Sequence, residues 1–161
     1  MKHFFYCSFL ILLFFPGPVS SEQANTGIVS KVFDGDSLIV KLAQGRSVEI
    51  RLAEIDAPEK DQPFGDQSRN ELRKILGGKP VRIEIYDVDA YGRVVAHIYR
   101  LSDQLHINAW MVDHGLAWVY PKYAEDQNLF ALQKNAREKH LGLWGLSGSQ
   151  PMPPWEWRHR K

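Results

Sequence analysis

Three short stretches of the chain carry side chains that together could hydrolyse a phosphodiester. They are Asp34-Gly35-Asp36, the segment from Arg51 to Glu59, and Tyr91-Gly92-Arg93. This reaction needs an activated water, neutralisation of charge on the non-bridging oxygens, and stabilisation of the leaving alkoxide. The stretches offer carboxylates for a hard cation and for a water, and two guanidinium groups for phosphate.

Asp36 and Asp56 are the candidate ligands of a cation. Each follows a segment with the pattern of a β-strand, so in a barrel both can lie at one rim. Calcium accepts carboxylate, carbonyl and water oxygens in a flexible shell. An Asp-Gly-Asp segment is also an ordinary turn, and that reading suffices for Asp34, whose carboxylate can hydrogen-bond the turn backbone. The segment lacks the EF-hand pattern, which predicts a modest affinity for calcium.

Segments of alternating polarity separate these residues. Residues 26–52 contain three such segments, and the third, 46–52, alternates apolar and polar side chains as a half-buried strand does. Gly35 and Gly45 stand where tight turns are needed. The sequence therefore predicts three antiparallel strands in this region.

The rest of the chain shows both helical and extended patterns. Helices are predicted over 67–76, 107–114 and 127–141, strands over 80–87 and 93–100, and a short extended piece over 117–120. A glycine follows the end of each predicted helix. Five strands interrupted by one helix and followed by two more predict a β-barrel with helices, an α+β fold of the OB type.

The N-terminus has the layout of a secretory signal peptide. Lys2 and His3 precede an apolar run that ends at Phe15, and small residues follow as far as Ser21. The run of about 12 residues is shorter than the roughly 20 that a membrane-spanning helix needs. We expect cleavage after Ser21 and export to the periplasm or the medium, without stable membrane association afterwards. An uncleaved signal anchor is the alternative.

The remaining 140 residues of the 161 fit one folded domain and a tail. The domain is expected over 22–144. The tail, 145–161, is rich in proline, tryptophan and basic residues, and it could stack on bases, pack back on the body or stay mobile. Cys7 is the only cysteine and lies inside the signal segment, so the mature domain would contain no disulfide.

The charge balance limits how a nucleic acid could be bound. The chain has 20 Lys and Arg against 19 Asp and Glu, and removing residues 1–21 takes away Lys2 and no acid, which leaves 19 against 19. Proteins that grip many duplex phosphates usually carry a basic excess. The absence of that excess favours a small cleft that contacts few phosphates.

The order of the three motifs resembles that of the staphylococcal nuclease (thermonuclease) family. The resemblance covers about residues 27–144 and includes Asn108 and Gly115-Leu116-Ala117. It implies an OB-fold barrel in which calcium lies on Asp36, Asp56 and the main-chain carbonyl of Ala57. Ala57 replaces the threonine of the staphylococcal enzyme, a change that a backbone ligand tolerates.

The same resemblance implies roles for the other charged residues. Glu59 would take the proton from the attacking water, or would organise the water and its loop. Arg51 would bind the phosphate, and Arg93 would bind it and assist the leaving 5′ oxygen. A guanidinium can donate two parallel hydrogen bonds to phosphate. The alternative for Arg51 is a surface ion pair with Glu49, a type of contact worth only about 0 to 1 kcal/mol.

Three tyrosines are candidates for binding the bases, because stacking on an aromatic ring is worth about 1 to 3 kcal/mol per base. Tyr91 matches the family's Tyr-Gly-Arg motif directly. Tyr120 and Tyr123 fall in the region that contacts the nucleotide in the family, although the local pattern departs from the staphylococcal one. The loop after Glu59 is also shorter than in that enzyme.

The resemblance implies a secreted, calcium-dependent nuclease that acts as a monomer on DNA and RNA. Single-stranded or frayed substrates, low sequence specificity and 3′-phosphate ends are expected. The alternatives are a noncatalytic OB-fold module that binds nucleic acid or protein, and a calcium-stabilised structural domain. A noncatalytic module would be expected to lose one of the charged positions, and a structural domain would not need two arginines. The histidines match no zinc-site spacing and are interpreted as structural or surface residues.

Overall fold

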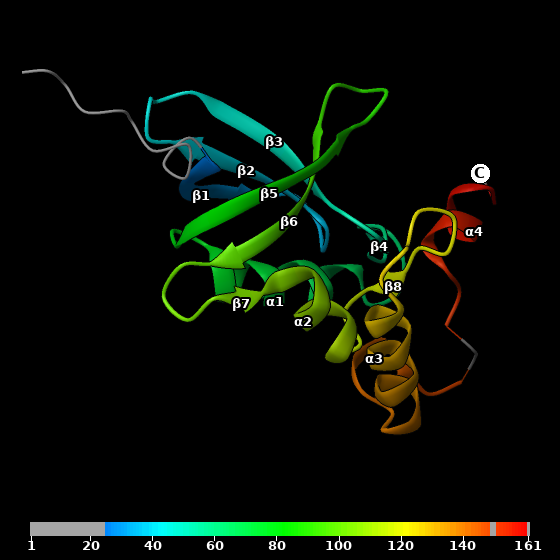
Figure 1. Ribbon diagram of the computed structural model, residues 1–161. Coiled ribbons are helices and arrows are strands. Elements are labelled where there is room, and N and C mark those ends of the chain that lie inside the picture. Colours follow the sequence, from blue (N-terminus) through cyan, green and yellow to red (C-terminus); the bar gives the residue numbers. More distant parts are fainter. Residues whose placement is uncertain (1–24, 149–150, 161) are drawn as a thin grey trace, which may run out of the picture.

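The computed structural model describes residues 25–148 and 151–160, so the predicted signal peptide lies outside the described residues. Its centre is a closed five-stranded barrel (Figure 1). The barrel strands are β1 (Thr26–Val32), β2 (Ser37–Leu42), β3 (Ser47–Leu52), β5 (Pro80–Val88) and β6 (Val94–Arg100). They pair in the order β3-β2-β1-β5-β6, and a parallel pairing of β3 with β6 closes the barrel. The predicted OB-type barrel is confirmed.

Shorter strands and the helices surround one end of this barrel. The short strands are β4 (Ile55–Asp56), β7 (Leu105–His106) and β8 (Trp118–Val119). The helices are α1 (Gly65–Leu76), α2 (Ile107–Asp113), α3 (Gln127–Glu138), α4 (Pro154–Arg158) and the 3-10 turn η2 (Gly142–Gly145). Figure 1 shows α1 and α2 on one side of the barrel and α4 near β4 and β8. Among the described residues, no helix is long and apolar enough to cross a bilayer.

Alternating side chains of the strands fill the barrel. Antiparallel register places Leu38 opposite Ile50 and Val40 opposite Val48, so apolar side chains of β2 and β3 share the inner face. Leu38, Val40 and Ile50 are fully buried. From outside the barrel, α1 and α2 add buried Leu72, Leu76, Ile107, Met111 and Val112. The apolar side chains of the alternating pattern face this core, which explains why the three predicted strands form there.

Asn108 ties α2 to the barrel rim. Its side chain is fully buried, and Oδ1 accepts a hydrogen bond from the backbone N–H of Ile98 at 3.1 Å. Its Nδ2 donates to the carbonyl oxygens of Ala53 at 3.0 Å and Ala96 at 3.2 Å. Because a buried amide is stable only when its polar atoms are paired, this network fixes the chain between β3 and β4. That chain leads directly to Asp56.

The third helix ends earlier than its apolar pattern predicts. We expected it to extend to 141, but α3 ends at Glu138 and the chain turns back through His140 and Gly142, both with φ of 53°. At Gly142 a Cβ atom would lie 2.2 Å from the carbonyl oxygen of Gly115. The positive φ and this close approach both require glycine. The contact stops the helix and docks the following segment against the end of α2.

Candidate active site

A cleft of about 650 Å³ opens at the rim of the barrel. The ends of β3 and β4, the β5–β6 turn and the segment after β8 surround it. The cleft is lined by eight of the nine predicted site residues: Asp36, Arg51, Ala57, Glu59, Tyr91, Arg93, Tyr120 and Tyr123. The ninth, Asp56, is fully buried and hydrogen-bonded to Arg51, which lines the cleft. The fold therefore brings the three motifs to one place.

Asp36 is held rigidly at the floor of the cleft. Its Oδ2 accepts a hydrogen bond from the backbone N–H of Ala57 at 2.7 Å. Its Oδ1 accepts from Ser37 Oγ at 2.9 Å and from Arg51 Nη1 at 2.9 Å. Asp34 Oδ1 in turn accepts the Asp36 backbone N–H at 3.0 Å, as the turn pattern predicts. The carboxylate of Asp36 thus has one well-defined orientation.

Gly35 lets this turn approach the rest of the site. A Cβ atom at position 35 would lie 1.9 Å from Ser68 Oγ and 2.6 Å from the Ala57 Cβ. Ser68 is fully buried in α1 and cannot move aside freely, because its hydroxyl donates to the Leu116 carbonyl at 2.7 Å. Only glycine allows Asp36 to reach the backbone of Ala57.

Arg51 joins the two buried aspartates. Its Nη1 contacts Asp36 Oδ1 at 2.9 Å and its Nη2 contacts Asp56 Oδ1 at 2.7 Å. The alternative pairing with Glu49 is therefore wrong. Burial, together with the charge of Asp36, raises the pKa of Asp56 even though Arg51 and Arg158 donate to it. Burial lowers the pKa of Arg51 less than the two carboxylates raise it, so its guanidinium stays charged.

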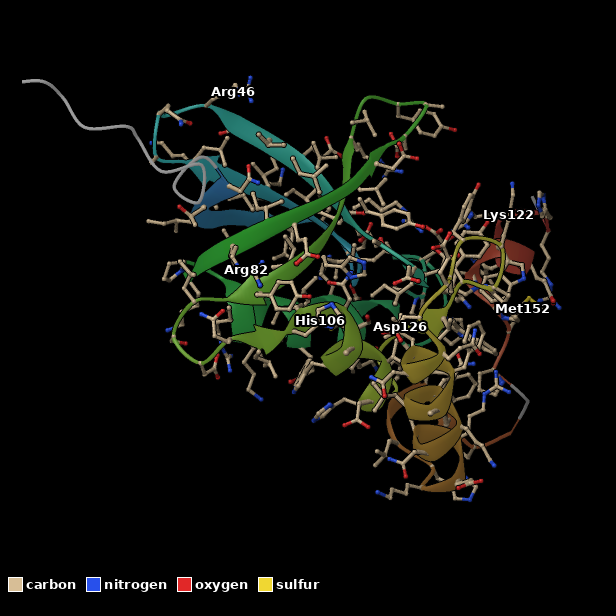
Figure 2. All side chains as sticks on the ribbon, in the orientation of Figure 1. Arg46, Arg82, His106, Lys122, Asp126 and Met152 are labelled. Carbon is tan, nitrogen blue, oxygen red and sulfur yellow. The ribbon has the colours of Figure 1, made fainter. Side chains whose placement is uncertain are left out.

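Replacing Arg51 by methionine should destabilise the fold. We expect the free energy of unfolding without added cation to fall by about 3 kcal/mol, because the change leaves two buried carboxylates without their shared partner. Urea denaturation in EGTA measures this effect. Arg46→Met, at an exposed turn of the barrel (Figure 2), is the matched control and should change stability little. Equal stability of the two variants would contradict the buried pairing.

Asp34 should make the cation-free protein less stable as the pH rises. Burial and the nearby Asp36 charge raise the pKa of Asp34 to about 7 from 3.8. The folded state therefore binds a proton that the unfolded chain releases, and stability is lost between about pH 4 and pH 7. Asp34→Asn keeps the oxygen that accepts the turn N–H. We expect it to stabilise the protein by about 2 kcal/mol or more at pH 8 and little at pH 4. Denaturation in EGTA at both pH values tests this, and a pH-independent difference would contradict it.

Arg93 lies on another wall of the cleft, after the β5–β6 turn. Both its Nε and its Nη2 contact Asp89 Oδ2 at 2.7 Å. Asp89 Oδ1 accepts the backbone N–H groups of Tyr91 and Arg93, each at 3.0 Å. These hydrogen bonds lower the pKa of Asp89 more than burial raises it. The Tyr91 side chain is 87% exposed, and its ring centre lies 5.6 Å from Arg93 Cζ.

Tyr120 and Tyr123 form an edge-to-face pair with ring centres 4.9 Å apart. Their loop is held by Glu54, a buried residue with φ of 64° that the sequence did not single out. The Glu54 carbonyl accepts the Tyr120 N–H at 2.8 Å, and its side-chain Oε1 accepts the N–H groups of Glu125 and Asp126. Glu54 thus positions the aromatic wall of the cleft.

Two histidines lie next to the Glu54 side chain. His97 Nε2 lies 3.4 Å from Glu54 Oε2, and His97 Nδ1 lies 3.1 Å from His106 Nε2. Burial and the neighbouring His97 lower the pKa of His106. These contacts fit the structural role expected from the sequence. Among the described residues, no group of three or more His, Cys, Asp or Glu side chains forms a metal site.

A residue of the C-terminal tail completes the charged cluster. Arg158 Nη2 contacts Asp56 Oδ2 at 2.8 Å, and its Nη1 contacts Glu59 Oε1 at 2.6 Å. The tail also brings Trp155 against Tyr120, with ring centres 5.1 Å apart. Sequence reasoning missed both residues as parts of the site, because about 100 positions separate Arg158 from its partners and no local pattern links them.

The donor set nevertheless fits a single hard cation. Asp36 and Asp56 both bind Arg51 and therefore lie side by side, and each is almost completely buried. Their mutual repulsion raises the pKa of Asp56 in addition to the effect of burial. Two negative charges therefore lie close together in a buried place, and a bound cation would offset them. Calcium prefers such carboxylate oxygens and accepts a main-chain carbonyl beside them, as Ala57 could supply.

Comparison with known proteins points to one family. Residues 49–145 match the model of the family described as staphylococcal nuclease homologue. A protein named "Uncharacterized endonuclease" from Escherichia coli is 41% identical over 152 residues, which cover 94% of this chain and 96% of that protein. A protein of the same name from Haemophilus influenzae is 38% identical, with 94% and 83% covered. A "Micrococcal nuclease" from Shigella flexneri is 36% identical over 141 residues, with 82% and 79% covered.

Proposed function

The chain belongs to the staphylococcal nuclease family and is a nuclease, and from this premise we propose that it is a calcium-dependent phosphodiesterase acting on DNA and RNA. One observation carries the proposal. Asp36, Glu59 and two arginines from motifs far apart in the sequence line one cleft, and Asp56 lies directly behind its wall, bonded to Arg51. A noncatalytic module would have no need to keep all five of these groups.

The residues of the cleft divide the steps of hydrolysis among themselves. Asp36, Asp56 and the carbonyl of Ala57 would hold calcium, which when bound supplies positive charge to the phosphate and its attacking water. Glu59 accepts the proton of that water. Arg51 donates to the non-bridging oxygens of the phosphate.

Arg93 acts on the leaving-group side of the phosphate. Its guanidinium carries charge at every accessible pH and can donate to the 5′ oxygen as negative charge develops there. Asp89 holds Nε and Nη2, and no hydrogen bond from Nη1 is seen among the described residues. Nη1 therefore remains for the substrate. Cleavage on that side leaves the phosphate on the 3′ end.

Substrate binding would rely on stacking rather than on a long basic groove. Four tyrosines line the cleft, the three predicted ones and Tyr86, and the net charge of residues 22–161 is 0 when His is counted as neutral. Both features favour single-stranded or frayed nucleic acid and little sequence preference. We further propose that the protein is exported through its N-terminal segment and works as a monomer in the periplasm or the medium.

The chemical identity of the products tests the proposed direction of cleavage. Single-stranded DNA is digested in calcium, and the fragments are offered to a DNA polymerase as primers, with and without prior phosphatase treatment. We expect extension only after the phosphatase has removed 3′-phosphates. Fragments that extend directly would carry 3′-hydroxyl groups and would contradict the role of Arg93 at the 5′ oxygen. The same digest with RNA shows whether both nucleic acids are substrates.

A further inference from the structure

The C-terminal segment 151–160 reaches the proposed active site, where Arg158 lines the cleft. Figure 1 shows α4 beside β4. Arg158 on α4 donates to both oxygens of Asp56, at 3.2 Å from Nη1 and 2.8 Å from Nη2. Its Nη1 also donates to Glu59 Oε1 at 2.6 Å. One guanidinium therefore binds a proposed calcium ligand and the proposed general base together.

A second residue of the segment, Trp155, stacks on Tyr120, which lines the cleft. The Trp155 ring lies parallel to the Tyr120 ring, with 2° between their planes and 5.1 Å between their centres. Its edge also meets Trp118, with ring centres 5.8 Å apart. A nucleotide base that stacked on this face of Tyr120 would have to displace Trp155.

The segment is docked by polar contacts outside the cleft as well. Gln62 Nε2 donates to the Met152 carbonyl at 2.7 Å, and Trp157 Nε1 donates to Asp61 Oδ1 at 3.2 Å. Figure 2 shows Met152 on the irregular segment that leads into α4. Both partners belong to the loop that follows Glu59. The tail thus packs on the body of the protein, and its contacts converge on the site.

The contacts of Arg158 and Trp155 are those that a cation and a base would need. Arg158 places its positive charge against both oxygens of Asp56, where a bound cation would otherwise lie, and it occupies the Glu59 oxygen that would orient a water. We propose that segment 151–160 is an autoinhibitory arm: Arg158 takes the place of the cation, Trp155 takes the place of a base, and calcium binding releases the arm. This inference rests on the proposed calcium-dependent function.

Calcium affinity measured without substrate tests the arm. Isothermal titration of calcium into the protein purified from its full-length sequence is compared with Arg158→Gln and with Arg160→Gln. Arg160 is an exposed arginine just beyond α4 whose Cζ lies 5.9 Å from the Trp157 ring centre, and among the described contacts none joins it to Asp56 or Glu59, so it is the matched control. We expect Arg158→Gln to bind calcium about tenfold more tightly, because hydrogen bonds between charged groups are worth at least that factor. Arg160→Gln should match the parent.

If Arg158→Gln binds calcium as tightly as the parent or more weakly, the proposal of an autoinhibitory arm is overturned. Arg158 would then have another role, such as holding phosphate. Binding by neither protein would overturn the calcium assignment itself, and the arm with it. Calcium binding by Arg158→Gln but not by the parent would support the proposal, because it would mean that Arg158 blocks the site completely. Asp56→Asn, which should lose calcium binding in either background, shows whether the measured site is the proposed one.

Hydrogen exchange gives a readout that does not depend on a variant. The backbone N–H groups of Glu156 and Trp157 donate to Pro153, so their protection reports on the docked helix. We expect saturating calcium to speed exchange in this segment while the barrel strands stay protected. Unchanged or slower exchange there would overturn release of the arm by calcium.

Discussion

Replacing Arg93 by alanine should lower kcat/KM on single-stranded DNA by about 10²- to 10³-fold, the loss typical of removing one donor to a developing oxyanion. The side chain lines the cleft and is oriented by Asp89 from within the same turn. Its contacts lie outside the core, so the fold should tolerate the change. The loss should fall mainly on kcat, because the leaving oxygen carries its charge only in the transition state.

Three companion variants sharpen the test of Arg93. Arg46→Ala removes an exposed arginine from a distant turn and should leave activity unchanged. Arg93→Lys keeps the charge and loses the fork of donors, and we expect it to recover only part of the activity. Asp89→Asn weakens the orientation of Arg93 and should have a smaller effect than Arg93→Ala. Full activity of Arg93→Ala would contradict a role at the leaving oxygen.

Replacing Glu59 by glutamine should lower kcat by about 10²- to 10⁴-fold, the range that positioned proton transfer contributes. The change keeps the size of the side chain and removes its charge and its ability to accept a proton. Glu138→Gln, on the exposed part of α3, is a matched control that should leave kcat unchanged.

Glu59 also binds Arg158, so its two functions must be separated. In the Arg158→Gln background the contact is absent, and Glu59→Gln can then act only through the water. We expect the same large loss of kcat in both backgrounds. A loss confined to the parent background would show that Glu59 serves only to hold the C-terminal segment, and the general-base role would be wrong.

Local patterns predicted the barrel well, because each strand shows its burial in the sequence. The alternation in 46–52 corresponds to β3, and the Asp-Gly and Gln-Gly turns lie between the strands they were expected to join. The predicted helix over 67–76 corresponds to α1, which begins two residues earlier, at Gly65. The end of α3 was placed too late, because contact with Gly115 stops the chain there and that contact is long-range. The helix α4 was missed because its five residues carry no apolar period.

For the site too, features that depend on local sequence were predicted, and features that depend on long-range contacts were not. Asp36 and Asp56 were expected at one rim, and the structure joins them through hydrogen bonds from Arg51. Their pairing with Arg51 was not expected, since single-residue patterns do not show which cation meets which anion. Glu54 and Arg158 were missed for a related reason. Each is identified by partners about 70 to 100 positions away.

The most direct test of the account is cleavage of single-stranded DNA by the purified protein in calcium or in EGTA, beside Arg93→Ala. We predict rapid cleavage by the parent in calcium, none in EGTA, and a collapse of the calcium-dependent rate in Arg93→Ala. Undiminished cleavage in EGTA would contradict the assignment of calcium to Asp36 and Asp56. Binding of DNA without cleavage under any of these conditions would contradict the enzyme itself and would favour a binding module on the same barrel.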